Sequence, residues 1–168
     1  PVFGVILMGA IIIFVINPPV SWFNLWLSSL LSNMGNSSKL ILGAVLGMMM
    51  AIDFGGPINK AAYVFGTAQI AEGNYDIMAS VMIGGMIAPL AIAIASIIFK
   101  NKFTKKEREA GLTNFVMGIS FITEGAIPFA ASDPLRVIPP CAIGAGVAGA
   151  LSMVFGCTLR APHGGVFV

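Results

Sequence analysis

Charged residues are scarce in this chain. Asp, Glu, Lys and Arg make up 10% of its 168 residues, whereas roughly 25% of the residues of a soluble domain are charged. Hydrophobic residues make up 57% of the sequence, and the mean hydropathy is +0.94. This composition excludes an ordinary soluble domain and predicts an integral membrane protein.

Cysteine and histidine are nearly absent. Cys141 and Cys157 lie sixteen residues apart in one apolar stretch without CxxC spacing, and His163 is the single histidine. This pattern argues against a zinc site or a thiol redox motif, so we predict no metal ligand and expect buried, inert thiols.

The few basic residues are concentrated in one segment. Five of the nine Lys and Arg residues fall in KNKFTKKER, residues 100–108, and the net charge is only +2. Because an apolar run precedes this segment, it is interpreted as a membrane-flanking loop rather than a nucleic-acid patch. No nucleic-acid partner is expected.

Two apolar segments are long enough to span a bilayer or nearly so. Residues 77–99 carry no charge and would cover roughly 34 Å as a helix. The basic residues after this segment predict that residue 77 lies outside and residue 100 inside. Residues 141–159 predict a second, nearly spanning helix that begins after Pro139 and Pro140 and is rich in small residues.

Other apolar segments are interrupted. Residues 40–52 predict a half-helix or a strongly shared span, because about twenty residues are needed to cross a bilayer. Residues 112–131 divide into two short arms around Thr123, Glu124 and Gly125, which favours a re-entrant hairpin. Gly43 and Gly47 form a GxxxG pair that predicts close helix packing.

The N-terminal part also predicts membrane contact. Residues 1–16 are interpreted as the tail of a spanning helix, and residues 21–39, with Trp22 and Trp26 four apart, as an interfacial amphipathic helix. The chain begins inside an apolar run, so we expect a piece of a longer protein. The predicted fold is an all-α, polytopic membrane protein, with residues 1–168 as one domain.

Glu124 is the main candidate for a binding residue. A carboxylate at membrane depth costs at least a few kcal/mol, so it is expected to line a wet cavity or to have a partner. Its oxygens could accept hydrogen bonds from sugar hydroxyls, while Phe121 or Phe129 covers an apolar sugar face. The alternative is an ion pair with Arg136 that only holds the hairpin.

Asp133 and Arg136 flank Pro134 and could pair on one helical turn. Asp133 is predicted as the N-cap of the next helix, with Pro134 in its first position.

The stretch DFGGPINK, residues 53–60, combines helix breakers with polar groups. Unwound backbone at this depth is tolerated chiefly around a cavity, which makes Asn59 and Lys60 candidate site residues. An ordinary turn in which Lys60 extends to the surface is the alternative. These interpretations are about equal for Asp53 and Lys60, and a site role is slightly favoured for Asn59.

His163 lies between a proline and two glycines. A lone histidine is often structural, but its imidazole could also hydrogen-bond a sugar hydroxyl or assist its deprotonation.

Three stretches together resemble a known family. These are DFGGPINKAAYVFG, GISFITEGAIPFAASDPLRVIP and LRAPHGGVFV. In order and spacing they are similar to the membrane-embedded IIC domain of the bacterial phosphoenolpyruvate-dependent sugar phosphotransferase system, fructose branch. The resemblance spans nearly all of residues 37–168.

The resemblance implies a multi-pass transporter of the bacterial cytoplasmic membrane, often a homodimer, that binds a sugar outside and presents it for phosphorylation inside. The donor would be a phosphocysteine on a B domain, separate or fused, so no cofactor and no phosphorylated residue are expected in this chain. Glu124, beside Thr123, matches the family's sugar-binding glutamate in its ITE motif. Asn59 and Lys60 match the GGPxNK segment near the pocket, and His163 falls in the PHGG stretch.

The leading hypothesis is group translocation of fructose or a related sugar by a partial transporter domain. Whether the chain counts as part of an enzyme stays open; it would be the membrane subunit of a sugar phosphotransferase. Candidate substrate-binding residues are Glu124, Thr123, Asn59, Lys60, His163 and Arg136. The alternatives are an ion-coupled secondary transporter using Glu124 and Asp133, an intramembrane hydrolase, and a structural membrane fragment.

Overall fold

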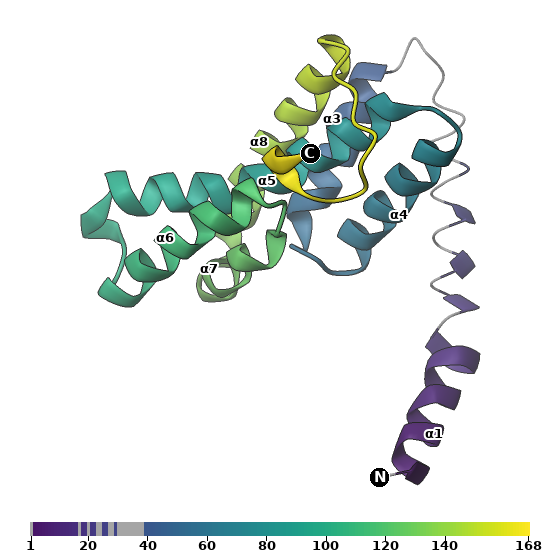
Figure 1. The fold of residues 1–168 in the computed structure, drawn as a ribbon. Coiled ribbons are helices and arrows are strands. Elements are labelled where there is room, and N and C mark those ends of the chain that lie inside the picture. The colour runs from purple at the N-terminus through teal and green to yellow at the C-terminus, as the bar shows by residue number, and fades with distance from the viewer. Residues whose placement is uncertain (1, 17, 20, 23–24, 27–28, 30–38) are drawn as a thin grey trace. The chain divides into compact units, whose positions relative to one another are not determined.

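A computed structural model of the chain describes residues 2–16, 18–19, 21–22, 25–26, 29 and 39–168. The described residues form helices and connecting turns without a strand, so the all-α prediction is confirmed (Figure 1). The chain divides into two compact units, Pro1–Gly35 and Asn36–Val168. Assignment of the chain to a single domain stays a prediction.

The first unit contains α1, Val2–Ile11, which continues as a π-helical segment, Ile12–Ile16. Its large apolar side chains are mostly exposed. The expected helix is therefore present over the described residues 2–16, and its role as the tail of a spanning helix stays a prediction. The interfacial helix predicted for residues 21–39 lies largely outside the described residues.

The second unit contains the other helices whose bounds the structure gives. Its long helices are α5, Tyr75–Ile98, and α8, Pro134–Val154, which are long and apolar enough to cross a membrane. The others are α3 (Lys39–Ile52), α4 (Pro57–Ala71), α6 (Lys105–Ile119) and α7 (Ile127–Ser132), with short 3-10 helices η3 (Lys100–Lys102), η4 (Thr123–Ala126) and η5 (Gly165–Phe167).

Glycines bring α3, α5 and α8 into close contact. A Cβ atom at Gly43 would meet the backbone of Gly149 at less than 3.0 Å, and one at Gly47 would meet the backbone of Ala145 as closely. Ser80 of α5 lies between these helices, and its Oγ is 3.2 Å from the carbonyl oxygen of Gly43 and 3.1 Å from that of Gly149. The GxxxG prediction is confirmed, since only small residues permit this approach.

The beginning and end of α8 differ from the prediction of a helix over residues 141–159. The helix begins at Pro134 because the Asp133 side chain accepts a hydrogen bond from the backbone of Arg136, as predicted for an N-cap. This cap and a proline in the first position favour helix initiation there, and Pro139 and Pro140 are then accommodated in the second turn.

The helix α8 ends at Val154 because Gly156 adopts a left-handed φ of 64°. The amide of Cys157 donates to the Ser152 carbonyl at 3.0 Å, and the amide of Gly156 donates to the Met153 carbonyl at 3.2 Å. This pair of bonds is a Schellman motif. Cys141 is buried as expected, but the expectation of a buried thiol is wrong for Cys157, which follows the helix end and is exposed.

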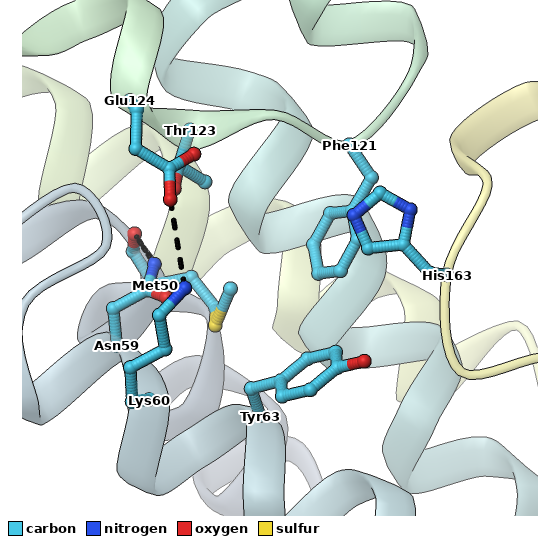
Figure 2. Close-up of a pocket in the computed structure, with 8 residues that line it drawn as sticks. All are labelled: Met50, Asn59, Lys60, Tyr63, Phe121, Thr123, Glu124 and His163. Carbon is cyan, nitrogen blue, oxygen red and sulfur yellow. Dashed lines mark hydrogen bonds and ion pairs between the residues drawn. The ribbon is translucent and has the colours of Figure 1, made fainter.

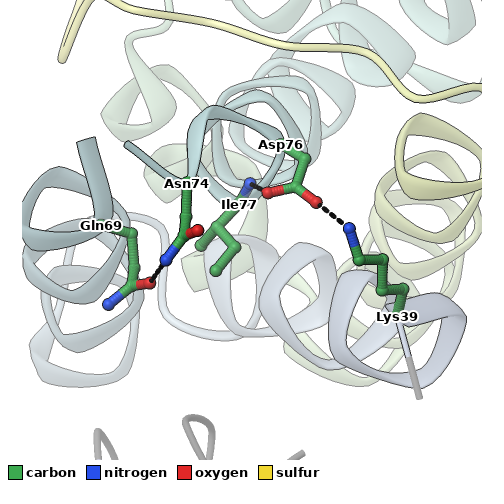
Figure 3. A network of polar contacts seen from close by, with 5 residues as sticks. All are labelled: Lys39, Gln69, Asn74, Asp76 and Ile77. Carbon is green, nitrogen blue, oxygen red and sulfur yellow. Dashed lines mark hydrogen bonds and ion pairs between the residues drawn. The ribbon is translucent and has the colours of Figure 1, made fainter. Parts of the chain in front are cut away.

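The helices α3 and α4 form a hairpin whose open end lies beside the start of α5. Lys39 Nζ pairs with Asp76 Oδ2 at 2.7 Å, and Asn74 Nδ2 donates to Gln69 Oε1 at 2.7 Å (Figure 3). The first residue of α3, the last turn of α4 and the first turn of α5 therefore lie together. The closed end of the hairpin, residues 53–56, points toward the other end of α5.

The chain after α5 forms a second helical bend. The basic segment is partly η3 and partly the first turn of α6, which is held by a capping box between Thr104 and Glu107. After α6 the chain turns through residues 120–122 into η4 and α7. The predicted division of residues 112–131 into two short arms is confirmed. The re-entrant position of these arms in a membrane stays a prediction.

Candidate functional site

The turn between α3 and α4 is built around Asp53. Its Oδ2 accepts a hydrogen bond from the amide of Ile58 at 2.7 Å, and its Oδ1 accepts one from the amide of Asn59 at 3.0 Å. These are amides of the first turn of α4, which have no partner within the helix. Asp53 therefore caps α4 from outside the helix, which favours the turn interpretation for this residue.

Asn59 fixes the start of α4 against the end of α3. Its side chain is 2% exposed, and its Nδ2 donates to the carbonyl oxygen of Met50 at 2.7 Å. That carbonyl belongs to the last turn of α3, where backbone acceptors lack helical partners. The position of the following residue, Lys60, depends on this contact.

The turn after α6 presents Glu124. Phe121 has a φ of 64°, which is strained for a residue with a side chain, and the amide of Ile122 donates to the Met117 carbonyl at 2.8 Å. A Cβ atom at Gly125 would overlap the side chain of Asn114. Glycine at this position thus lets η4 lie directly on α6, with Glu124 on its other side.

The C-terminal segment closes over the same turn. Gly165 has a φ of 62°, and a Cβ atom there would overlap the Ile119 carbonyl. This approach places the His163 ring 5.2 Å from the Phe121 ring, centroid to centroid. Gly85 of α5 leaves the space that the Phe121 ring occupies, since a Cβ there would lie under 3.0 Å from it.

These three segments enclose a cavity of about 180 Å³. Figure 2 shows Lys60 and Glu124 on one side of it and the rings of Tyr63, Phe121 and His163 on the other. The lining residues are Met50, Asn59, Lys60, Tyr63, Phe121, Thr123, Glu124 and His163.

Five of the six predicted substrate-binding residues line this cavity. Arg136 does not: its side chain is 87% exposed and its Nη1 lies 3.5 Å from Asp133 Oδ2. The predicted pairing of Asp133 with Arg136 is therefore confirmed. The alternative of a Glu124 ion pair with Arg136 is not observed, because Glu124 pairs with Lys60 instead.

The ion pair between Lys60 and Glu124, on the polar side of the cavity, is weak enough to open. Lys60 Nζ lies 3.5 Å from Glu124 Oε1, and the two side chains are 59% and 48% exposed. Pairs with this exposure contribute about 0–1 kcal/mol, because water screens them. Hydroxyl groups of a ligand can therefore replace this contact at small cost.

The described residues contain no group of three or more His, Cys, Asp or Glu side chains that could hold a metal ion. The site consists instead of a carboxylate, an ammonium group, a buried amide, an imidazole and two further aromatic rings. Such a mixture suits a small neutral ligand that has both hydroxyl groups and an apolar face.

Sequence reasoning missed Tyr63 and Met50. Tyr63 lies one helical turn after Asn59, so the i, i+4 spacing on α4 is the signal that could have identified it. The sequence allows either Phe121 or Phe129 as the cover of an apolar sugar face. The structure separates them, because Phe121 lines the cavity whereas Phe129 packs edge-on against Phe103 in the core, with ring centroids 6.2 Å apart.

Comparison with known proteins gave consistent matches. The family described as "Phosphotransferase system, EIIC" matches residues 1–144. A fructose-specific EIIABC component of Bacillus subtilis is 55% identical over the whole chain, which covers 26% of that protein. A fructose permease IIC component of Bacillus amyloliquefaciens is 53% identical, with 55% of its length covered.

A third relative has a similar identity. A fructose-specific EIIC component of Haloferax volcanii is 47% identical over 169 aligned residues, covering 45% of its length. The chain thus spans from about a quarter to about half of these curated relatives. No solved structure gave a significant match.

Proposed function

Because the chain belongs to the EIIC family of the phosphotransferase system, we propose that it forms the sugar-binding part of a fructose-translocating membrane component. The cavity between α4, η4 and the C-terminal segment would be the sugar site. The family and the two long apolar helices mark it as part of a membrane protein, and its place would be the bacterial cytoplasmic membrane, as a multi-pass protein.

The convergence of three distant segments carries this proposal. Lys60 and Glu124 lie 64 residues apart in the sequence but 3.5 Å apart in space, and His163 approaches from a third segment. Each segment reaches the cavity through a break in its helix or a left-handed turn. Backbone of this kind at membrane depth is expected where it lines a cavity.

The two helical bends would be re-entrant hairpins from opposite faces. The 14 residues of α3 and the 15 residues of α4 give arms of only about 21–23 Å, short of the roughly 30 Å hydrocarbon core. The second bend starts from the other end of α5. The hairpin tips meet where a Cβ on Gly55 would lie 2.8 Å from Glu124 Oε1, so the sugar site would lie near mid-membrane.

In this site Glu124 would accept hydrogen bonds from sugar hydroxyls, while Lys60 donates to their oxygens. Thr123 is 4% exposed and would add a hydroxyl contact beside the carboxylate. Charge-assisted hydrogen bonds of this kind are stronger than neutral ones. The sugar would displace the Lys60–Glu124 contact and bridge the two side chains.

Phosphoryl transfer would then occur at a hydroxyl on the inner side. The hydroxyl oxygen forms a bond to phosphorus as the bond between phosphorus and the donor breaks, and His163 accepts the hydroxyl proton. The product is an anionic ester that does not recross hydrocarbon readily, so phosphorylation traps the sugar inside.

The donor would be a phosphorylated B domain, fused or separate, rather than a cofactor of this chain. The name of the Vibrio cholerae relative, a fructose-specific EIIB'BC component, joins B and C parts in one protein. A phosphocysteine on that domain and a homodimer of the membrane part follow from the family resemblance.

Fructose uptake into membrane vesicles that contain the intact protein tests this function. With phosphoenolpyruvate and the soluble phosphoryl carriers supplied, fructose should accumulate as a phosphate ester, and a protonophore should not prevent it. Accumulation of free fructose that collapses with the proton gradient and ignores phosphoenolpyruvate would instead establish an ion-coupled transporter.

A further inference from the structure

One half of the cavity wall is aromatic, and two of its rings, Tyr63 and Phe121, have no role in the hydrogen bonding and proton transfer described above. The ring centroids of Tyr63 and Phe121 lie 6.3 Å apart, and those of Phe121 and His163 lie 5.2 Å apart. Figure 2 shows these rings on the side of the cavity opposite Lys60 and Glu124. A ligand in the cavity would therefore touch polar groups on one side and ring carbons on the other.

The central ring of this wall is held firmly. Phe121 is 5% exposed, its backbone has a left-handed φ, and Gly85 provides the space for its ring. A strained conformation persists only where its surroundings enforce it. The wall is therefore preorganised before any ligand binds.

The fold alone does not explain why residue 63 of this wall is a tyrosine. Its ring is only half-buried, and within the described residues its hydroxyl has no hydrogen-bond partner. Its helix position is nevertheless fixed one turn earlier by the Asn59 contact with Met50. A tyrosine with a fixed helix position and a partly exposed ring that lines the cavity is suited to contact a ligand.

Building on the proposed function, we propose that Tyr63 is a specificity-determining residue that selects a cyclic sugar over an acyclic sugar alcohol. A closed sugar ring presents hydroxyls at its edge and a rigid face of C–H groups, which match the two halves of this cavity. An acyclic hexitol offers similar hydroxyls to Glu124 and Lys60 but no fixed apolar face to Tyr63. It must also be ordered on binding, which costs conformational entropy.

The cavity size agrees with a single sugar ring. A volume of about 180 Å³ is below the range of roughly 300–1,000 Å³ that holds drug-sized ligands. The size therefore fits one ligand of monosaccharide size, and the preference for a closed ring rests on the aromatic half of the wall.

Equilibrium binding of D-fructose and D-mannitol to the intact protein in membrane vesicles tests this role. Tyr63→Met refills the volume with a flexible apolar chain, and Tyr63→Phe removes only the hydroxyl. The chain's other tyrosine, Tyr75, provides a matched control as Tyr75→Met, because it lies outside the cavity and stacks with Arg160 at 5.0 Å.

We expect Tyr63→Met to weaken fructose binding about tenfold and to leave mannitol binding unchanged, while Tyr63→Phe keeps most of the preference. Tyr75→Met should behave like the natural protein. Equal losses for both ligands, unchanged fructose binding in Tyr63→Met, or a full loss of preference in Tyr63→Phe would overturn the assignment. Fructose binding to the natural protein tests the proposed function, whereas the effect of Tyr63→Met tests the specificity role of Tyr63. Failure of one claim can therefore be distinguished from failure of the other.

Discussion

Replacing Asn59 with leucine should destabilise the second unit and weaken sugar binding together. The Asn59 side chain is 2% exposed and donates a 2.7 Å hydrogen bond to the carbonyl oxygen of Met50. Leucine leaves that buried acceptor without a partner. The expected loss in the free energy of unfolding is about 1–3 kcal/mol, the cost of an unsatisfied buried polar group.

The functional effect follows from the position of Asn59 on α4. Lys60 and Tyr63 lie on the same part of the helix, so looser docking of α4 on α3 shifts both side chains relative to Glu124. We expect several-fold weaker fructose binding in addition to the lower stability. Denaturant unfolding in detergent measures the first quantity, and equilibrium binding in vesicles measures the second.

Thr67→Val is the matched control on α4. Thr67 Oγ1 donates at 2.9 Å to the Val64 carbonyl within its own helix, so its removal should change stability by less than about 0.5 kcal/mol. If Asn59→Leu were as stable as the natural protein and bound fructose equally well, the Asn59 contact would not position the site.

Two further predictions concern packing and pH. Gly47→Ala should cost about 1–3 kcal/mol in unfolding free energy, because its Cβ would overlap the backbone of Ala145. Gly4→Ala, which has open space around it, should be nearly neutral; equal effects would refute the close packing of α3 on α8. The backbone hydrogen bond from Thr104, followed by its side-chain hydrogen bond, holds the pKa of Glu107 below its ordinary value. The resulting stabilisation of the start of α6 should be complete above the ordinary glutamate pKa and lost as the pH falls through the lowered one. Amide hydrogen exchange in this turn should show that loss, and Glu107→Gln should abolish its pH dependence; an unchanged profile would contradict the capping role.

Local signals in the sequence were sufficient for most helix boundaries. The breaks at residues 53–56 and 120–126 coincide with glycines, prolines and polar residues, whose backbone preferences act within a few positions. The Asp133 cap was predictable for the same reason. The prediction of a helix that begins at residue 141 is wrong by seven residues, because the Asp133 cap and Pro134 start α8 earlier and Pro139 and Pro140 fit into its second turn.

Contacts between distant segments were harder to predict. The pairing of Glu124 with Lys60 rather than Arg136 depends on how the α3–α4 hairpin packs against η4. Local sequence patterns do not predict this contact between distant segments. The choice of Phe121 over Phe129 as a cavity wall depends on the space left by Gly85 of another helix. The three motifs that resemble the family contain the five candidate residues that line one cavity in the structure.

The affinity for fructose after Glu124→Gln is the most direct measure of whether the carboxylate binds the sugar. Exchanging charge-assisted for neutral hydrogen bonds should weaken binding roughly 5- to 30-fold. Glu109→Gln, at an exposed position of α6 outside the cavity, should bind as the natural protein does. Fructose binding that is unchanged in a folded Glu124→Gln protein would contradict the assigned sugar site.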